Sequence, residues 1–216
     1  ARRVFILAGS TLRHKTDEIA AIERALGDRH AATSDGIHPH APRTDVLAAA
    51  NAARAADADL VVTVGGGSVT DAGKIVTLLI KHGVQDIASF EPLRVYVTPE
   101  GQVVNPVTVG PDIRVICVPT TLSGGEFNAL SGSTDEETAH KQGYEHRMMA
   151  PVMVVLDPAL SRHTPEWLWL STGVRSVDHA VETLGSDKSN DFANGLADSA
   201  LRLLAEGLPQ IGRAHV

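Results

Sequence analysis

The order of apolar and polar residues predicts strands and helices in turn over most of the chain. Apolar, β-branched runs that are typical of buried strands occur at residues 3–8, 60–64 and 112–118. Apolar residues recur at helical spacing between these runs, over residues 16–26, 45–56 and 69–79. Strands that alternate with helices indicate βαβ units, and hence an α/β fold with a parallel sheet and a ligand site at the carboxyl ends of its strands.

The pattern changes to helical spacing alone from residue 164 onward. Residues 151–157 are apolar and predict a last buried strand before this change, and residues 84–111 predict a loop or hairpin insertion. We therefore expect a dinucleotide-binding α/β domain over residues 1–160. Residues 161–210 would then form the first helices of a truncated all-α domain.

The last six residues, 211–216, interrupt the amphipathic helix predicted over residues 190–208. Their sequence, Ile-Gly-Arg-Ala-His-Val, resembles the translation of a common sequencing adapter. We interpret them as a non-native tail on a gene fragment, and the alternative is a natural helix end with a glycine near its C-terminus.

A glycine-rich turn follows the central predicted strand and carries the strongest chemical signal. Gly65, Gly66 and Gly67 lie between the strand at 60–64 and the helix at 69–79. The N–H groups at the start of a helix, with the positive end of its dipole, bind phosphate well, and missing Cβ atoms let the anion approach. Ser68 is placed to cap the helix and to donate its hydroxyl to the same anion. The alternative is a glycine-rich turn without a ligand.

Neither the G-x-G-x-x-G nor the Walker spacing is present. The stretch resembles the G-G-G-S-x-x-D-x-x-K motif of the iron-containing alcohol dehydrogenase superfamily, matched by Gly65, Gly66, Gly67, Ser68, Asp71 and Lys74. Residues 119–126 are similar to the P-T-T-x-x-x-G-S-E loop of that family, with Gly125 where Ser is usual. The resemblance implies that NAD or NADP binds here.

Several further site residues follow from this resemblance alone. It implies that the glycine loop holds the cofactor's pyrophosphate and that Thr120, Thr121 and Ser123 donate hydrogen bonds to the cofactor. It also implies that Lys141 lies near the nicotinamide ribose. Gly9 stands where many NAD-preferring relatives have Asp, so NADPH is not excluded.

A third motif bears on metal binding. Iron-dependent members have G-x-D-x-x-x-H-A-x-E where this chain has residues 173–182, and their Asp and His bind the metal. His179 and Glu182 match, but Arg175 replaces the Asp, and a guanidinium carries only donors and a permanent charge. We therefore expect no metal, as in the maleylacetate reductases, although these have Asn at this position.

Arg175 and His179 instead make a coherent catalytic pair. Arg175 would clamp a substrate carboxylate or polarise a carbonyl, and His179, one turn along, would deliver a proton. The alternative is that Arg175 forms an ion pair with Asp178 or Glu182 on the helix surface.

Composition and charge limit the classes of molecule that the protein is expected to bind. A net charge of −7 without a basic run argues against nucleic acid or a membrane surface, and one cysteine, Cys117, fits a reducing cytoplasm. We expect a cytoplasmic NAD(P)H-dependent enzyme, homodimeric when full-length, that reduces a small carbonyl compound such as a maleylacetate-like keto acid, a ketone or an aldehyde. The alternatives are a metal-dependent alcohol or polyol dehydrogenase of the same superfamily and a nucleotide-binding module without turnover.

Overall fold

The computed structural model describes residues 1–211, with the backbone alone for Ile211. Its contacts divide the chain into two compact units. The sheet unit comprises residues 1–120 and 125–163, and the helical unit comprises residues 121–124 and the chain from Thr164 on. The non-native tail that we predicted lies outside the described residues, except for Ile211. The assignment of functional domains to residues 1–160 and 161–210 stays a prediction.

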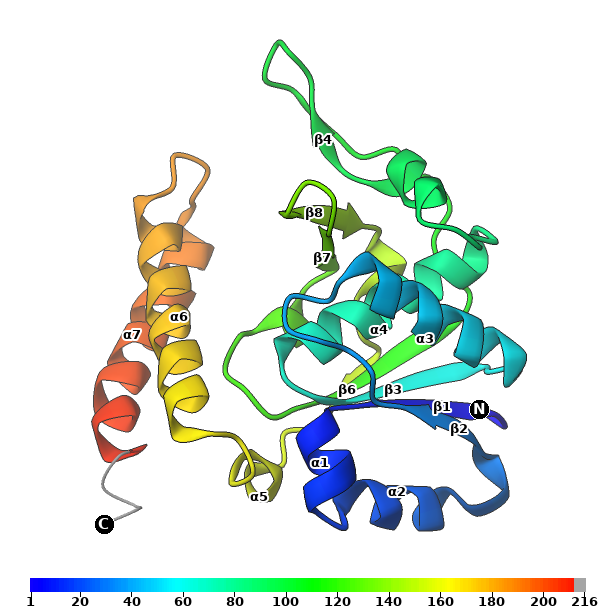
Figure 1. Cartoon of the computed structure of the whole chain (residues 1–216). Coiled ribbons are helices and arrows are strands. Elements are labelled where there is room, and N and C mark those ends of the chain that lie inside the picture. The colour runs from blue at the N-terminus through cyan, green and yellow to red at the C-terminus, as the bar shows by residue number, and fades with distance from the viewer. Residues whose placement is uncertain (212–216) are drawn as a thin grey trace. The chain divides into compact units, whose positions relative to one another are not determined.

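A five-stranded sheet in the order β2-β1-β3-β6-β9, with all neighbours parallel, forms the centre of the sheet unit (Figure 1). Its strands are β1 Val4–Ala8, β2 His30–Ser34, β3 Leu60–Gly65, β6 Arg114–Pro119 and β9 Met153–Val154. The predicted α/β class with a parallel sheet followed by helices is confirmed.

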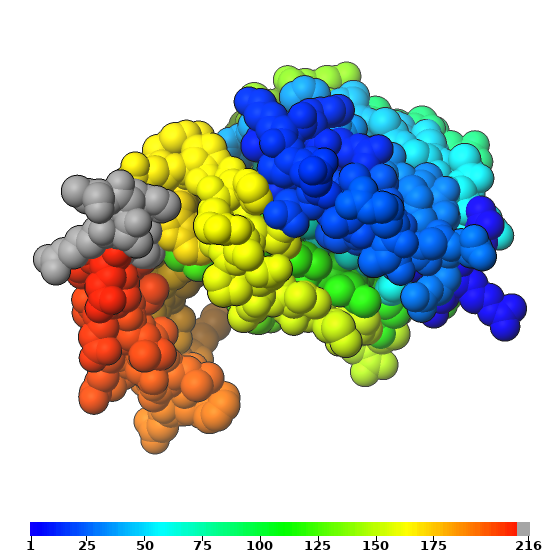
Figure 2. Space-filling model, turned by 90° about the horizontal axis from the view of Figure 1, so that it is seen from below, coloured from blue at the N-terminus to red at the C-terminus, as the bar shows by residue number. Residues whose placement is uncertain are grey.

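Helices cover both faces of this sheet. Helices α1 Ser10–Lys15 and α2 Glu18–Leu26 lie on one face, and α3 Arg43–Ala55 and α4 Gly67–Lys81 on the other (Figure 1). Figure 2, seen from below, shows the blue α1 and α2 over the lower face. Strand β1 alternates between the two cores: Phe5 and Leu7 join the cluster with α3 and α4, while Ile6 and Ala8 join the cluster with α1 and α2.

Two antiparallel hairpins extend the sheet unit. Strands β4 Tyr96–Val97 and β5 Val103–Val104 form the first, within the insertion predicted over residues 84–111. Strands β7 Leu130–Asp135 and β8 His140–Glu145 form the second, which the sequence did not predict. The remaining short elements are helix α5 Pro158–Ser161 and 3-10 turns at Gly27–Arg29, Ala88–Leu93, Gly125–Phe127 and Arg147–Met149.

The strand predicted over residues 151–157 is present as β9, the last strand of the sheet, but the predictions of its length and its burial were wrong. Strand β9 has only two residues, and Met153 is 55% and Leu156 66% exposed. The strand lies at the edge of the sheet with β6 as its one neighbour, so apolar composition alone did not reveal its exposure.

The helical unit contains α6 Glu166–Gly185 and α7 Asp191–Ile211. A Cβ atom at Gly173 would lie 2.7 Å from Leu208 Cδ2, so this glycine allows the two helices to approach closely. Leu122 is tied to α6 through Thr172 Oγ1 at 3.1 Å and Ser176 Oγ at 2.7 Å. Within residues 1–211, no helix is long and apolar enough to cross a membrane.

Candidate dinucleotide site

The sheet order creates a site beyond the carboxyl ends of β1 and β3. The chain passes from β1 to β2 on one side and then returns to place β3 on the other side of β1. Ligands of parallel sheets bind at such a switch point, because the connections diverge there and leave a crevice. Gly9 follows β1 and donates its N–H to the Val64 carbonyl at 2.8 Å, so the two strand ends lie side by side.

The glycine turn leads directly into α4 at this place. Gly66 is the N-cap residue and no side chain caps the helix, so the prediction that Ser68 is the cap was wrong. Ser68 lies in the first helical turn, where its Oγ accepts a hydrogen bond from the His40 N–H at 2.9 Å. Because this bond uses an oxygen lone pair, the Ser68 hydroxyl proton remains available to an anion. The first N–H groups of α4 have no acceptor within the helix and favour the same anion.

Two glycines allow α4 to pack this close to the sheet. A Cβ at Gly65 would lie 2.9 Å from Val69 Cγ2 and 3.2 Å from the Gly9 nitrogen. A Cβ at Gly73, further along α4, would overlap Thr63 Cγ2 on β3. A glycine inside a helical pattern, such as Gly73, is a signal of close packing that the sequence already contains.

Lys74, the last residue of the glycine motif, has a structural role. Its side chain is fully buried, and Nζ donates to the carbonyls of Gly125 and Leu130 at 2.6 Å each. Burial lowers the pKa of Lys74, while Asp71, whose Oδ1 is 3.9 Å from Nζ, opposes this shift. Lys74 therefore ties the loop after β6 to α4.

Glu126 lies in the same loop and is 4% exposed. Its Oε2 has no hydrogen-bond partner among the described residues, and burial raises its pKa. Cys117, on β6, is fully buried, and burial raises the pKa of its thiol to about 11, which fits a core residue and not a nucleophile.

The structure brings several predicted cofactor residues together in the sheet unit. Lys141 Nζ lies 2.9 Å from Asp71 Oδ2, so a residue expected at the ribose contacts a residue of the glycine motif. Thr120 donates its N–H to the Gly65 carbonyl at 3.0 Å and so follows the same edge. Thr121 and Ser123 belong to the helical unit instead, and their hydroxyl oxygens lie 3.3 Å apart.

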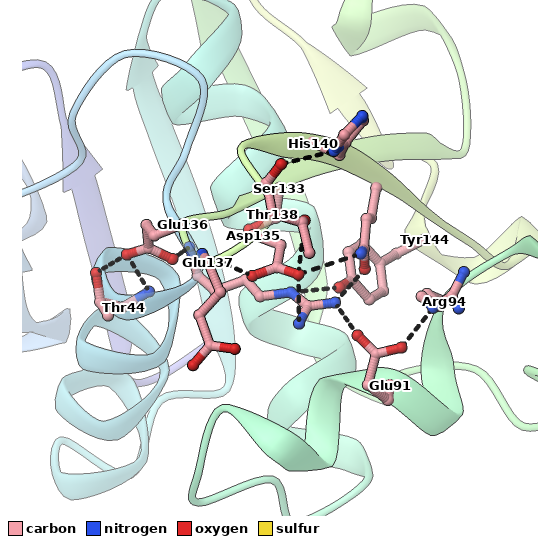
Figure 3. A network of polar contacts seen from close by, with 12 residues as sticks. Thr44, Glu91, Arg94, Ser133, Asp135, Glu136, Glu137, Thr138, His140 and Tyr144 are labelled. Atoms are coloured by element: carbon pink, nitrogen blue, oxygen red, sulfur yellow. Dashed lines mark hydrogen bonds and ion pairs between the residues drawn. The ribbon is translucent and has the colours of Figure 1, made fainter.

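The hairpin that carries Lys141 is anchored by a polar network that sequence analysis missed (Figure 3). Arg43, at the start of α3, is 3% exposed and donates to Glu91 at 2.7 Å and to the Tyr144 hydroxyl at 3.2 Å. It also donates to Gln142 and lies 3.9 Å from Asp135, with its guanidinium over the Phe90 ring. The hydrogen bond from Arg43 lowers the pKa of Glu91. A buried cation with this many partners fixes the hairpin against α3.

The N-terminus of α3 is capped from the same hairpin. The helix begins at Arg43 after Pro42, so Thr44 is not the N-cap residue that its type suggests. The Glu136 carboxylate accepts the Arg43 N–H at 3.1 Å and also contacts Thr44 (Figure 3). A carboxylate at this helix end is favourable, and it stands 93 positions from Arg43 in the sequence.

The candidate catalytic residues lie on α6 and are half exposed. Arg175 contacts Asp178 and lies 3.9 Å from Glu182, which is the surface ion pair that the sequence left open as the alternative. His179 Nδ1 also lies 3.9 Å from Glu182. The guanidinium of Arg175 carries only donors and a permanent positive charge, so it does not fit the position at which the iron-dependent members have a metal-binding Asp.

Comparisons with known proteins agree with the geometry of the sheet unit. The model of the family "Iron-containing alcohol dehydrogenase" matches residues 1–158. The chain is 42% identical to dehydrogenase ALT3 of Alternaria alternata over 84% of this chain and 46% of that protein. It is 30% identical to maleylacetate reductase 2 of Cupriavidus pinatubonensis over 97% of this chain and 48% of that protein.

A solved structure shows the same fold. The chain superimposes on sulfoacetaldehyde reductase from Bifidobacterium kashiwanohense in complex with NAD+ with a TM-score of 0.83, at 20% identity, over 99% of this chain and 54% of that one. The chain spans about half the length of the curated relatives that it matches. With the family model matched over most of its length, this chain belongs to the iron-containing alcohol dehydrogenase family.

Proposed function

We propose that the protein is an NAD(P)H-dependent oxidoreductase that reduces a carbonyl compound without a metal. The substrate class is a maleylacetate-like keto acid, a ketone or an aldehyde. The observation that carries the proposal is the glycine turn at the β1–β3 switch point, where α4 begins without a side-chain cap. Backbone donors and a helix dipole at this point suit a dinucleotide pyrophosphate.

In this proposal, different residues around the glycine turn bind the pyrophosphate and the ribose of the cofactor. Gly65, Gly66 and Gly67 let the pyrophosphate reach the backbone, and Ser68 donates its hydroxyl. Lys141, held at Asp71, offers an ammonium group to the ribose hydroxyls. With no carboxylate at position 9, both NAD and NADP fit the proposal.

Arg175 and His179 would act on the substrate carbonyl. A bound nicotinamide supplies the hydride for the carbonyl carbon. Arg175 would leave Asp178 and donate to the oxygen, stabilising the negative charge that develops there, and His179 would give the oxygen its proton. Together, the proton and the hydride would reduce the substrate to an alcohol or to a saturated keto acid.

Similarity to a maleylacetate reductase supports the reductase class and the acidic substrate. The test is an assay of the full-length protein with NADH and NADPH against maleylacetate, simple ketones and aldehydes, together with metal analysis. Turnover that persists after chelation supports the proposal. Stoichiometric tightly bound iron or zinc that is needed for turnover would overturn it in favour of a metal-dependent dehydrogenase.

A second candidate is a nucleotide-binding module without turnover. The ion pair between Arg175 and Asp178 favours it, because this contact occupies the guanidinium that the catalytic proposal requires. Tight NADH binding without reduction of any of these carbonyl compounds would select this candidate.

A further inference from the structure

The two faces of the β7–β8 hairpin have different surroundings. One face carries Ser131, Ser133 and Asp135 with their cross-strand neighbours, and it is buried against α3 through Arg43. The opposite face carries Thr134 paired with Lys141, followed by Gly132 paired with Gly143. Two glycines therefore lie side by side next to Lys141.

Gly132 provides the path of the Lys141 side chain. A Cβ atom at Gly132 would lie 2.9 Å from Lys141 Cδ and 3.0 Å from Cγ, and it would overlap Cε. The aliphatic stem therefore runs directly over the Gly132 backbone before Nζ reaches Asp71 at 2.9 Å. A glycine inside a strand weakens that strand. Such a glycine often marks a place where another group approaches the backbone closely.

The hairpin backbone cannot easily yield to a side chain at this position. Arg43 holds its buried face, and Ser133 Oγ donates to the Ala41 carbonyl at 2.7 Å. The Thr134 N–H donates to the same carbonyl at 3.1 Å. Lys141, with its side chain 47% exposed, is the flexible partner that would move.

We propose that Gly132 is a positioning residue for dinucleotide binding, because its missing side chain keeps the Lys141 ammonium beside Asp71 at the cofactor loop. The inference rests on the proposed function, in which Lys141 contacts the ribose. It assigns the effect to one backbone position that touches neither cofactor nor substrate.

The chain offers a matched control on the same face. A Cβ at Gly143 would meet only Leu130 Cδ1 at 3.4 Å and Val95 Cβ at 4.0 Å, which are ordinary contacts. Gly132→Ala and Gly143→Ala therefore add the same methyl group to paired positions, and only the first displaces Lys141. We expect both full-length variants to keep the melting temperature within about 2 °C of the wild type, since strand surface changes are small.

The experiment measures the Kd for NADH by fluorescence titration in four variants. Gly132→Ala and Lys141→Ala should each raise Kd about tenfold, the scale of one lost charge-assisted hydrogen bond. The double variant should be no weaker than either single one, and Gly143→Ala should match the wild type. The rate at which an amine reagent labels Lys141, followed by mass spectrometry, should rise in Gly132→Ala and not in Gly143→Ala.

The possible failures are distinguishable. If Lys141→Ala weakens binding but Gly132→Ala binds like Gly143→Ala, the inference is wrong and the proposed function stands. A Gly132→Ala effect that adds fully to that of Lys141→Ala also refutes it. If Lys141→Ala leaves Kd unchanged, the role of Lys141 fails and the inference fails with it. Absence of NADH binding by the wild-type protein would overturn the proposed function itself.

Discussion

Two cations, one that matches its motif and one that replaces a motif carboxylate, have opposite surroundings. Lys74 in the sheet unit is fully buried, and the oxygens that accept from it stand 51 to 56 positions away in the sequence. Arg175 in the helical unit is half exposed, and both its partners lie on its own helix. Distant parts of the chain thus fix the loop after β6, whereas local surface pairs hold the α6 residues. Preorganisation suits cofactor binding, and a weakly held arginine is free to turn to a substrate.

The largest effect should come from Arg175. In the full-length protein, Arg175→Ala should lower kcat/KM for carbonyl reduction about 10²- to 10³-fold, the usual cost of losing one donor to a developing oxyanion. The Kd for NADH should stay unchanged, and steady-state kinetics with binding titration checks both.

The matched control for this variant is Arg202→Ala. Arg202 forms an exposed ion pair with Asp198 on α7, 2.8 Å long, and its loss should change neither quantity. Equal effects of Arg175→Ala on catalysis and cofactor binding, or no effect on either, would mean that Arg175 is not a substrate clamp.

Lys74→Met tests whether the buried Lys74 stabilises the loop after β6. Removal of Nζ leaves the Gly125 and Leu130 carbonyls without their donor, so the free energy of unfolding should fall by about 3 kcal/mol. Lys81→Met, on the same helix, removes only the exposed pair with Asp112 and should cost less than about 1 kcal/mol. Urea denaturation compares the two, and similar losses would show that Lys74 does not anchor the loop.

A smaller effect is expected at Gly9. A Cβ there would lie 3.7 Å from the Gly65 Cα and the Val64 oxygen, so a side chain fits. Gly9→Asp should shift the ratio of NADH to NADPH affinity about tenfold toward NADH, because a carboxylate repels the 2′-phosphate. Gly195→Asp, in open space on α7, should leave the ratio unchanged. If both variants behave alike, Gly9 does not face the adenosine ribose.

The smallest effect concerns pH. Burial raises the pKa of Glu126 above the ordinary 4.5, so the wild type loses stability as pH rises from about 4.5 through the folded-state pKa. Glu126→Gln carries no such penalty, and its gain in melting temperature should grow from pH 4 to pH 8, to about 2–4 °C. A gain that is constant or shrinks with pH would show that Glu126 is not held in an unfavourable charged state.

Local patterns predicted the parts of this fold in which neighbours in the sequence are also neighbours in space. The strand, glycine turn and helix of β3 and α4 are of this kind, and so are the helices of the helical unit. Other features depend on contacts between residues that are far apart in the sequence, and local patterns did not predict them. Thr44 has the residue type of a cap, yet Glu136 caps α3 from the hairpin. The apolar residues 151–157 indicated burial, yet they lie at the sheet edge.

The candidate site divides in the same way. The glycine turn could be predicted from the sequence because phosphate binding at a helix N-terminus requires small residues in one unbroken run. Arg43 and Gly132 gave no local signal, since an arginine at a helix start and a glycine in a polar stretch occur on many surfaces. Their importance follows only from the hairpin, which brings Tyr144 and Gln142 to Arg43 from 101 and 99 positions away and lays the Lys141 side chain over Gly132.

The central claim is that an anionic dinucleotide binds at the first turn of α4, and Ser68→Asp tests it most directly. An acidic residue in the first turn of a helix is favourable, so the melting temperature should stay equal or rise. The same carboxylate would face the pyrophosphate, and the Kd for NADH should increase about 100-fold relative to the wild type. An unchanged Kd in a folded Ser68→Asp protein would contradict the account, because the cofactor would then bind elsewhere.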